Sequence, residues 1–157
     1  MLAIVWHSRT GGAEAMARAL AEGAGGMGRL LAAEQATAPQ LLEASGYVFI
    51  CPENLGSMTG VMKEMFDRCY YPLLGQIEGR AYATAIAAGS DGQGAQAQID
   101  RIVTGWRLKR VAEPLITNFH AQTPEAIAAP KRLTEKQVAA CRNLGAALAE
   151  GLQMGVF

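Results

Sequence analysis

The first seventeen residues constrain this chain most, because they pass from one hydrophobic pattern to another through a short polar loop. Leu2 to Trp6 is a continuously apolar run, which is typical of a strand covered on both faces. From Gly12 onward, alanine, methionine and leucine recur at helical spacing. The pattern therefore predicts a buried strand that turns sharply into a helix through the loop Ser8-Arg9-Thr10-Gly11-Gly12-Ala13.

This first loop has the composition of an anion site. Backbone N–H groups at the start of a helix, together with the helix dipole, favour a bound negative charge. The hydroxyl groups of Ser8 and Thr10 add hydrogen-bond donors, and Gly11 and Gly12 let the backbone approach the anion closely. We therefore expect the loop to hold a phosphate monoester.

The rest of the chain repeats the alternation of strand and helix. Hydrophobic patterns predict further strands at residues 29–33, 47–51, 80–88 and 108–116, and further helices at 39–43, about 59–72, 95–104 and 134–151. Pro114 interrupts the last strand, which favours an edge position, and residues 118–130 are expected to be loop. Parallel strands joined by right-handed crossovers predict an α/β three-layer sandwich, formed as a single domain over residues 1–157.

Three loops rich in glycine and polar residues follow the first, third and fourth predicted strands. They span residues 8–13, 52–57 and 89–94. Because the carboxyl ends of parallel strands meet at one edge of a sheet, ligands bind there in open α/β folds. Core packing explains the strands but not the polar and glycine content of these loops. We therefore predict that the three loops line one site.

Composition argues against several other classes of protein. Fourteen basic and fourteen acidic residues cancel, whereas a nucleic-acid-binding protein normally shows a basic surplus. The basic segment 107–110 is expected to be a solvated strand start.

The sequence also indicates where the protein is found and which sites it lacks. No apolar stretch approaches the roughly 20 residues of a membrane span. Cys51, Cys69 and Cys141 lack metal-ligand spacing, so no metal site is predicted and the thiols are expected to be reduced and mostly buried. Without a secretory leader, the expected location is the cytoplasm.

Two of the loops resemble motifs of a known family. Residues 8–13 resemble the S/T-x-T-G-x-T phosphate loop of flavodoxins. Residues 52–60, followed by Lys63 and by Phe66-Asp67-Arg68, resemble the PENFGSxSG…K…FFDR segment of flavodoxin-like, NAD(P)H-dependent FMN reductases and quinone reductases. The resemblance covers nearly the whole chain. It implies a flavodoxin-like sandwich with a five-stranded parallel sheet in the order 2-1-3-4-5, and FMN as the cofactor.

The resemblance also implies a role for each loop. The FMN phosphate is expected on the Ser8 and Thr10 side chains and on the backbone of residues 9–13. The 52–57 loop would border the isoalloxazine ring, and residues 89–92 would close its other side. The cofactor-binding residues expected in this way are Ser8, Arg9, Thr10, Gly11, Gly12, Ala13, Pro52, Glu53, Asn54, Leu55, Gly56, Ser57, Gly89, Ser90, Asp91 and Gly92.

The sequence departs from the family pattern at both ends of the expected site. Ala13 replaces the last hydroxyl of the phosphate motif, and the charge of Arg9 is expected to compensate for it. Leu55 stands where the family motif often has phenylalanine, and the 89–94 loop contains no aromatic residue. The flavin ring is therefore expected to be less covered than in electron-carrying flavodoxins.

An open ring face favours an oxidoreductase that uses NAD(P)H to reduce flavin or quinone-like acceptors, with the chemistry supplied by the flavin. No acid–base dyad, nucleophile elbow or Walker loop competes for this role, and no catalytic side chain is predicted. Two alternatives are a flavodoxin-like electron-transfer or flavin-binding module without NAD(P)H activity, and a scaffold that has lost its cofactor.

Small electron donors and acceptors are the expected partners. Tyr70, Tyr71 and Trp106 offer a homodimer surface, although core or edge packing explains them equally well.

Overall fold

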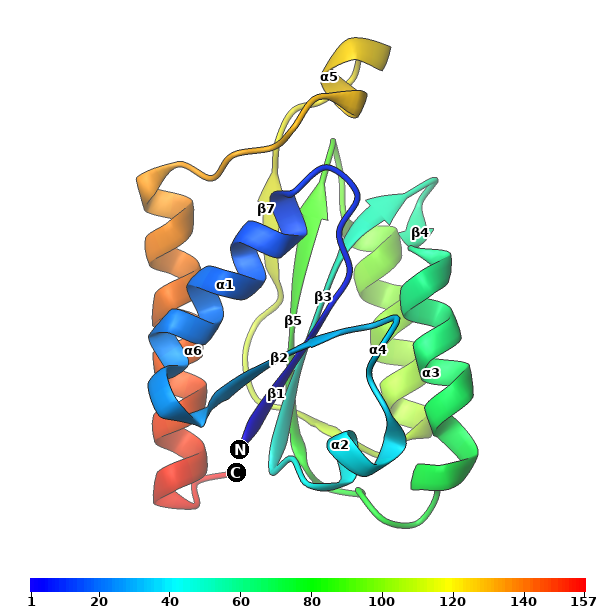
Figure 1. Ribbon diagram of the computed structural model, residues 1–157, viewed down its shortest axis with the longest axis vertical. Coiled ribbons are helices and arrows are strands. Elements are labelled where there is room, and N and C mark those ends of the chain that lie inside the picture. Colours follow the sequence, from blue (N-terminus) through cyan, green and yellow to red (C-terminus); the bar gives the residue numbers. More distant parts are fainter.

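A sheet of parallel strands lies between two layers of helices in the computed structural model, which describes residues 1–157 (Figure 1). The strands are β1 Leu2–Trp6, β2 Gly28–Ala32, β3 Gly46–Asn54, β4 Ser57–Met58, β5 Ala81–Ala88, β6 Lys109–Arg110 and β7 Leu115–Asn118. The helices are α1 Gly12–Ala24, α2 Ala38–Leu42, α3 Gly60–Leu73, α4 Gln93–Gly105, α5 Pro124–Ala128 and α6 Glu135–Met154, and a 3-10 turn covers Gly25–Met27.

The strand order confirms the topology expected from the sequence. Neighbouring strands follow the order β2-β1-β3-β5-β6, in which β5 is the predicted fourth strand and β6 begins the predicted fifth. That fifth strand is split, because β6 and β7 both pair with β5 on either side of Pro114, which has no N–H to continue the ladder. The short strand β4, which folds back antiparallel on β3, is an addition that the sequence patterns do not predict.

Each face of the sheet is covered by its own set of helices. Helices α1 and α6 lie on one face, and α2, α3 and α4 lie on the other (Figure 1). Successive side chains of β3 alternate between these two cores, so that Phe49 packs among the α3 and α4 residues whereas Val48 and Ile50 pack against α1. Both faces of the central strands are buried, which explains their continuously apolar sequence.

Helices α1 and α6 pack unusually closely because each has a glycine at the contact. A Cβ added to Gly145 would lie 2.0 Å from the backbone oxygen of Leu20, and one added to Gly23 would lie 2.0 Å from that of Arg142. The Arg142 guanidinium also donates two hydrogen bonds of 2.9 Å to the Glu22 carboxylate. The close packing of α1 against α6 therefore holds the N-terminus of α1 in a fixed position relative to the sheet.

The long segment between β7 and α6 contains a short helix that the sequence patterns did not predict. A loop is expected over residues 118–130, whereas the structure forms α5 within it. The signal was present locally: Thr123 caps the helix by accepting a 3.2 Å hydrogen bond from the Ala126 amide, and Pro124 occupies the first helical position. The following capping box of α6, Thr134 with Gln137, forms as predicted.

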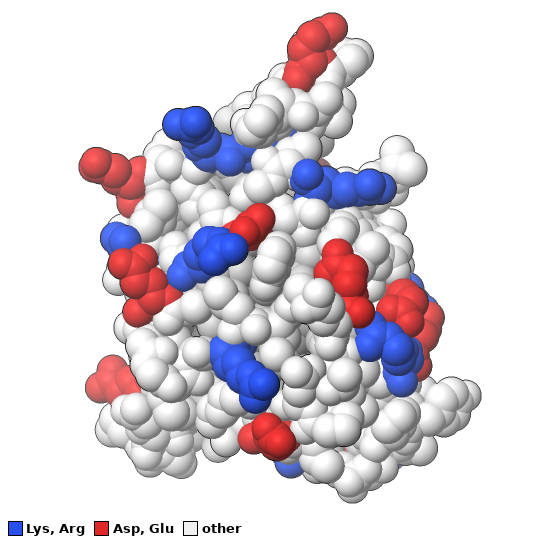
Figure 2. Space-filling view, viewed as in Figure 1, with Lys and Arg blue, Asp and Glu red and all other residues white.

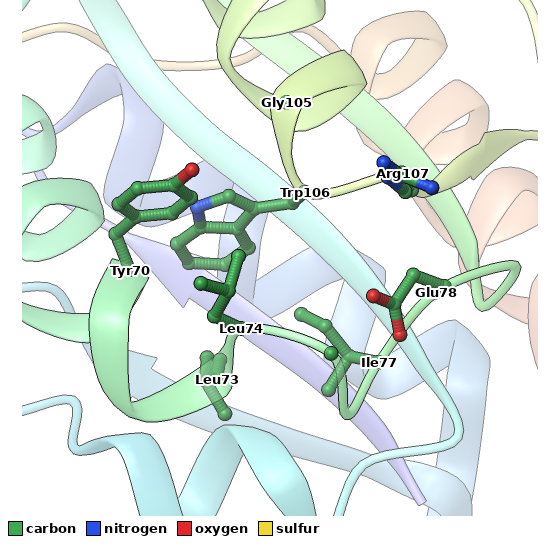
Figure 3. Close-up of a pocket in the computed structure, with 9 residues that line it drawn as sticks. Tyr70, Leu73, Leu74, Ile77, Glu78, Gly105, Trp106 and Arg107 are labelled. Carbon is green, nitrogen blue, oxygen red and sulfur yellow. The ribbon is translucent and has the colours of Figure 1, made fainter.

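Of the three residues for which a dimer surface and core packing are equally good explanations, one lies in the core. Trp106 is only 6% exposed and packs edge-on against Phe49 and Phe66. Its indole also lies beside Tyr70 in a small hollow of about 20 Å³ at the far end of α3 and α4 (Figure 3). That hollow has room for about one water molecule and so for no cofactor. Tyr71 alone of the three is well exposed.

No helix of the structure combines the length and the hydropathy required to cross a lipid bilayer. Basic and acidic side chains are interspersed over the face shown in Figure 2, where they leave no continuous stripe of one sign.

Candidate functional site

A cavity of about 740 Å³ opens at the carboxyl ends of β1, β3 and β5, where the three predicted loops meet. The predicted residues that line it are Ser8, Arg9, Thr10, Gly12, Ala13, Pro52, Glu53, Asn54, Leu55, Gly56, Gly89 and Ser90. Gly11, Ser57, Asp91 and Gly92 were also predicted but do not line it. The remaining lining residues are Ala87, Ala88, Phe119, Ala121, Ile127, Ala128 and Lys131.

The first loop leaves the start of α1 open to a ligand. Gly11 adopts a left-handed backbone with φ of 91°, and its amide donates a 3.1 Å hydrogen bond to the Ser8 hydroxyl, which shapes the loop. The amides of the first helical turn, at Gly12, Ala13 and Glu14, donate to no group of the protein. Of these residues, Gly12 and Ala13 line the cavity, so the start of α1 presents amides without protein partners at the cavity wall, as an anion site requires.

Helix α4 begins with the same backbone geometry but is already filled by an acidic side chain. Gly92 has φ of 87° and ψ of −13°, close to the 91° and −14° of Gly11. The Glu53 carboxylate accepts 2.9 Å hydrogen bonds from the amides of Gly92 and Ala95, one at each oxygen. At the start of α4 the chain's own Glu53 accepts hydrogen bonds from the amides, whereas the start of α1 presents its amides to the cavity.

The second loop carries its apolar side chain outward at the cavity wall. Leu55 is fully exposed and has φ of 52°, a left-handed conformation that is uncommon for a leucine. Gly56 follows with φ of 73°. The Ser57 hydroxyl donates a 3.3 Å hydrogen bond back to the Asn54 carbonyl, so Ser57 shapes this turn and does not face the cavity.

A fourth segment, residues 119–131, completes the cavity; we call it the strap. Its amides tie it to two predicted loops, because Phe119 donates to the Ala88 carbonyl, Ala121 to Gly89 and Lys131 to Thr10, at 2.7–2.8 Å. In Figure 1 the strap rises above the sheet and carries α5. No sequence pattern indicates that the strap lines this cavity, since it lies far along the chain and contains no phosphate-type motif.

The strap brings an aromatic side chain to the first loop. A Cβ added to Gly12 would lie 2.9 Å from the Phe119 ring and 3.2 Å from Lys131 Cβ, so a larger residue there would require the strap side chains to shift. Lys131 Nζ donates to the carbonyl oxygens of Ala126, Ile127 and Ala129, which end α5. The two loops expected to flank the ring contain no aromatic residue, and Phe119 reaches the cavity from the strap, outside both of them.

His7 supports the first loop from below. It is buried, and its Nδ1 shares a 2.9 Å hydrogen bond with the Thr59 hydroxyl, while Nε2 lies 3.6 Å from the exposed Glu34 carboxylate. Burial lowers the pKa of His7 below its ordinary value; Glu34 opposes this shift and Arg9 adds to it. His7 is therefore a neutral supporting residue near pH 7.

The charged groups of the cavity favour an anionic ligand. Arg9 is exposed and forms no ion pair, and Lys131 adds a second positive charge. Glu53 is the only acidic lining residue, and both of its oxygens are held by amides of α4. An anion at the start of α1 would thus meet open amides and positive charge.

These features define a flavodoxin-like α/β protein with a cavity at the carboxyl edge of the sheet, and comparison with known proteins agrees on the fold. A flavodoxin structure from the domain Archaea superimposes with a TM-score of 0.79 at 20% identity, over 98% of this chain and 99% of that one. A flavodoxin, WrbA-like protein from Agrobacterium tumefaciens gives 0.77 at 17% identity, over 98% and 97% of the two chains. Both likenesses concern the fold.

Sequence comparison identifies the family. Residues 8–116 match the family described as NADPH-dependent FMN reductase, and the chain belongs to that family. The chain is also 30% identical over 156 residues to a protein from Aquifex aeolicus (strain VF5) named flavodoxin, covering 94% of this chain and 84% of that relative.

Proposed function

We propose that this protein binds FMN in the cavity at the carboxyl edge of its sheet, with the phosphate at the start of α1. The amides of Gly12 and Ala13 carry this proposal, because they have no partner within the protein and their residues line the cavity in which a phosphate could accept from them. Membership of the NADPH-dependent FMN reductase family supports the same ligand.

The residues present fit such a ligand. A cavity of about 740 Å³ lies within the range of sites that enclose small molecules and cofactors. The start of α4 shows within the same molecule that this backbone geometry holds an oxyanion, since the Glu53 carboxylate occupies it. The loss of a hydroxyl at Ala13 leaves the cradle dependent on backbone amides, Ser8, Thr10 and the charge of Arg9.

The chain's own contribution is to bind, orient and shield the cofactor. Ser8 fixes the first loop through the Gly11 amide, and the second and third loops would flank the ring with backbone N–H and C=O groups. Leu55 and the strap residue Ile127 expose apolar surface at the cavity wall, where they would exclude water. Bound FMN would supply the redox chemistry, accepting a hydride or electrons and passing them on.

The phosphate assignment is tested by removing both hydroxyls of the first loop. In Ser8→Ala/Thr10→Ala, the loop loses the acceptor of the Gly11 amide and two side-chain donors toward the phosphate. We expect FMN affinity to fall by about tenfold or more, the usual loss for hydrogen bonds to a charged group, while the circular dichroism spectrum is unchanged. Thr104→Ala, at an exposed position on α4, is the control. Unchanged affinity in the double variant would place the phosphate elsewhere.

We further propose that the loaded protein is an oxidoreductase that takes electrons from NAD(P)H and passes them to flavin or quinone-like acceptors. The exposed Leu55 beside the cavity supports this, because no aromatic side chain of the second or third loop covers the ring position. Anaerobic stopped-flow mixing of the FMN-loaded protein with NADPH, and separately with NADH, should bleach the flavin absorbance with at least one of them. If neither NADPH nor NADH bleaches the flavin, the proposed NAD(P)H activity is wrong.

An electron-transfer module without NAD(P)H activity is the second candidate. The similarity to the Aquifex aeolicus protein named flavodoxin favours it. A redox titration separates the candidates, because a carrier should take up its two electrons in resolved one-electron steps, whereas a two-electron reductase should titrate in a single step. A protein that binds no added FMN would instead be a scaffold that has lost its cofactor.

The cysteines support a reducing compartment and play no part in the proposed chemistry. Cys51, Cys69 and Cys141 are all free and buried. Burial raises the pKa of Cys51 to about 12 and that of Cys141 to about 11, so neither is a thiolate at neutral pH. We therefore place the protein in the cytoplasm and assign no thiol chemistry to it.

A further inference from the structure

The second and third loops are joined by one side chain. Glu53, near the end of β3, uses both carboxylate oxygens on the first turn of α4, at 2.9 Å from the Gly92 amide and 2.9 Å from the Ala95 amide. A carboxylate at a helix N-terminus is favoured both by these charge-assisted hydrogen bonds and by the helix dipole. The pairing thus fixes where β3 ends relative to where α4 begins.

Two further contacts hold the same pair of elements together. A Cβ added to Gly94 would lie 2.0 Å from the Gly56 carbonyl oxygen, so the backbones of the second loop and α4 touch. Farther along, the Met58 amide donates a 2.8 Å hydrogen bond to Gln98 Oε1. The hairpin of β3 and β4 and the first turns of α4 therefore form one rigid unit with Glu53 on its cavity side.

We infer that Glu53 is a positioning residue that sets the affinity for the flavin ring and not for its phosphate. This inference rests on the proposed binding of FMN. The two loops that Glu53 joins are those proposed to flank the ring, whereas the phosphate cradle lies on β1 and α1. Because these contacts hold the two loops in place before the ring binds, binding does not have to order them. The entropy cost of ordering is therefore avoided, and the affinity for the ring is higher.

Two substitutions disrupt this unit by different routes. Glu53→Gln keeps the shape of the side chain but retains only one acceptor oxygen, so its NH₂ group faces one of the two α4 amides. Gly94→Ala leaves every charge in place but forces the Gly56 carbonyl away from α4. Glu113→Gln makes the same charge change as Glu53→Gln at an exposed residue without a hydrogen-bond partner and serves as the matched control.

The experiment is to measure dissociation constants of FMN and of riboflavin, which lacks the phosphate, for the wild-type chain and the three variants. In Glu53→Gln and in Gly94→Ala, we expect both constants to rise by the same factor, about tenfold, so that their ratio is unchanged. Glu113→Gln should match the wild type. Ser8→Ala/Thr10→Ala should show the opposite pattern, a weaker hold on FMN alone.

Several results would overturn the inference. Wild-type constants in Glu53→Gln would do so, as would a loss confined to FMN, which would assign the carboxylate to the phosphate cradle. Weak binding in Glu53→Gln with wild-type binding in Gly94→Ala would show that the carboxylate acts through its charge. If Glu53→Gln does not fold, Gly94→Ala decides the question. A wild-type chain that binds neither compound refutes the proposed function itself, which is a distinguishable result.

Discussion

His7 links the phosphate loop to the stability of the protein. The side chain is buried, contacts Thr59, and directly precedes Ser8, the first residue of the proposed cradle. Burial lowers its pKa in the folded state, so below the ordinary value of 6.5 the unfolded chain binds a proton more readily than the folded one. The stability that a neutral His7 contributes is therefore present above pH 6.5 and is lost as the pH falls from there toward the lower pKa of the folded state.

This residue gives a prediction for the pH dependence of unfolding. The free energy of urea unfolding of the wild-type chain should decline between pH 7.5 and pH 5.5, and His7→Asn should show a flatter profile because the titrating group is gone. Asn retains a polar group toward Thr59. Identical slopes for the two proteins would mean that His7 does not contribute to the pH dependence.

Single residues also show what the sequence can and cannot reveal about the site. Ser8 and Thr10 lie between a strand and a helix, and Gly12 begins that helix, so the local pattern predicts all three at the cavity. Phe119 and Lys131 reach the same cavity through hydrogen bonds to Ala88 and Thr10, which join segments far apart in the chain. Because such contacts depend on tertiary structure, no pattern near residue 119 or 131 indicates them.

Among the helices, the contact between α1 and α6 offers the sharpest test of packing. Gly145→Ala would place a methyl group 2.0 Å from the Leu20 carbonyl oxygen, where only backbone can move aside. We expect a loss of about 1–3 kcal/mol in the free energy of unfolding, as is usual for overpacking. Gly105→Ala, in a helix with no atom near the added methyl group, is the control and should be neutral or slightly stabilising. Equal stability of the two variants would contradict the close packing described here.

Element boundaries were predictable where the local chemistry is strong. The Thr134 and Gln137 capping box marked the start of α6, and the apolar run before residue 52 marked β3. The fifth strand is expected over residues 108–116 with an interruption at Pro114, and it forms as the two short strands β6 and β7 on either side of that proline. Helix α5 cannot be predicted from periodicity, because its five residues are too few to show a helical period.

At the scale of the whole molecule, the topology of the sheet brings the site together. The chain runs from β1 to β2 on one side and returns to β3 on the other, so the loops after β1 and β3 lie side by side at the carboxyl edge. This arrangement was predictable, because alternating strands and helices leave few parallel topologies. The position of the strap is not predictable in this way. The alternation of strands and helices does not require a segment that crosses from the third loop back to the first.

If the open amides of α1 hold a phosphate, the wild-type chain must distinguish FMN from riboflavin, and measuring the dissociation constants of both compounds shows whether it does. Both compounds carry the same ring, so any difference in affinity reports the phosphate. We expect FMN to bind at least about tenfold more tightly than riboflavin, because several hydrogen bonds hold a charged group at a helix N-terminus. Equal dissociation constants for the two compounds would contradict it.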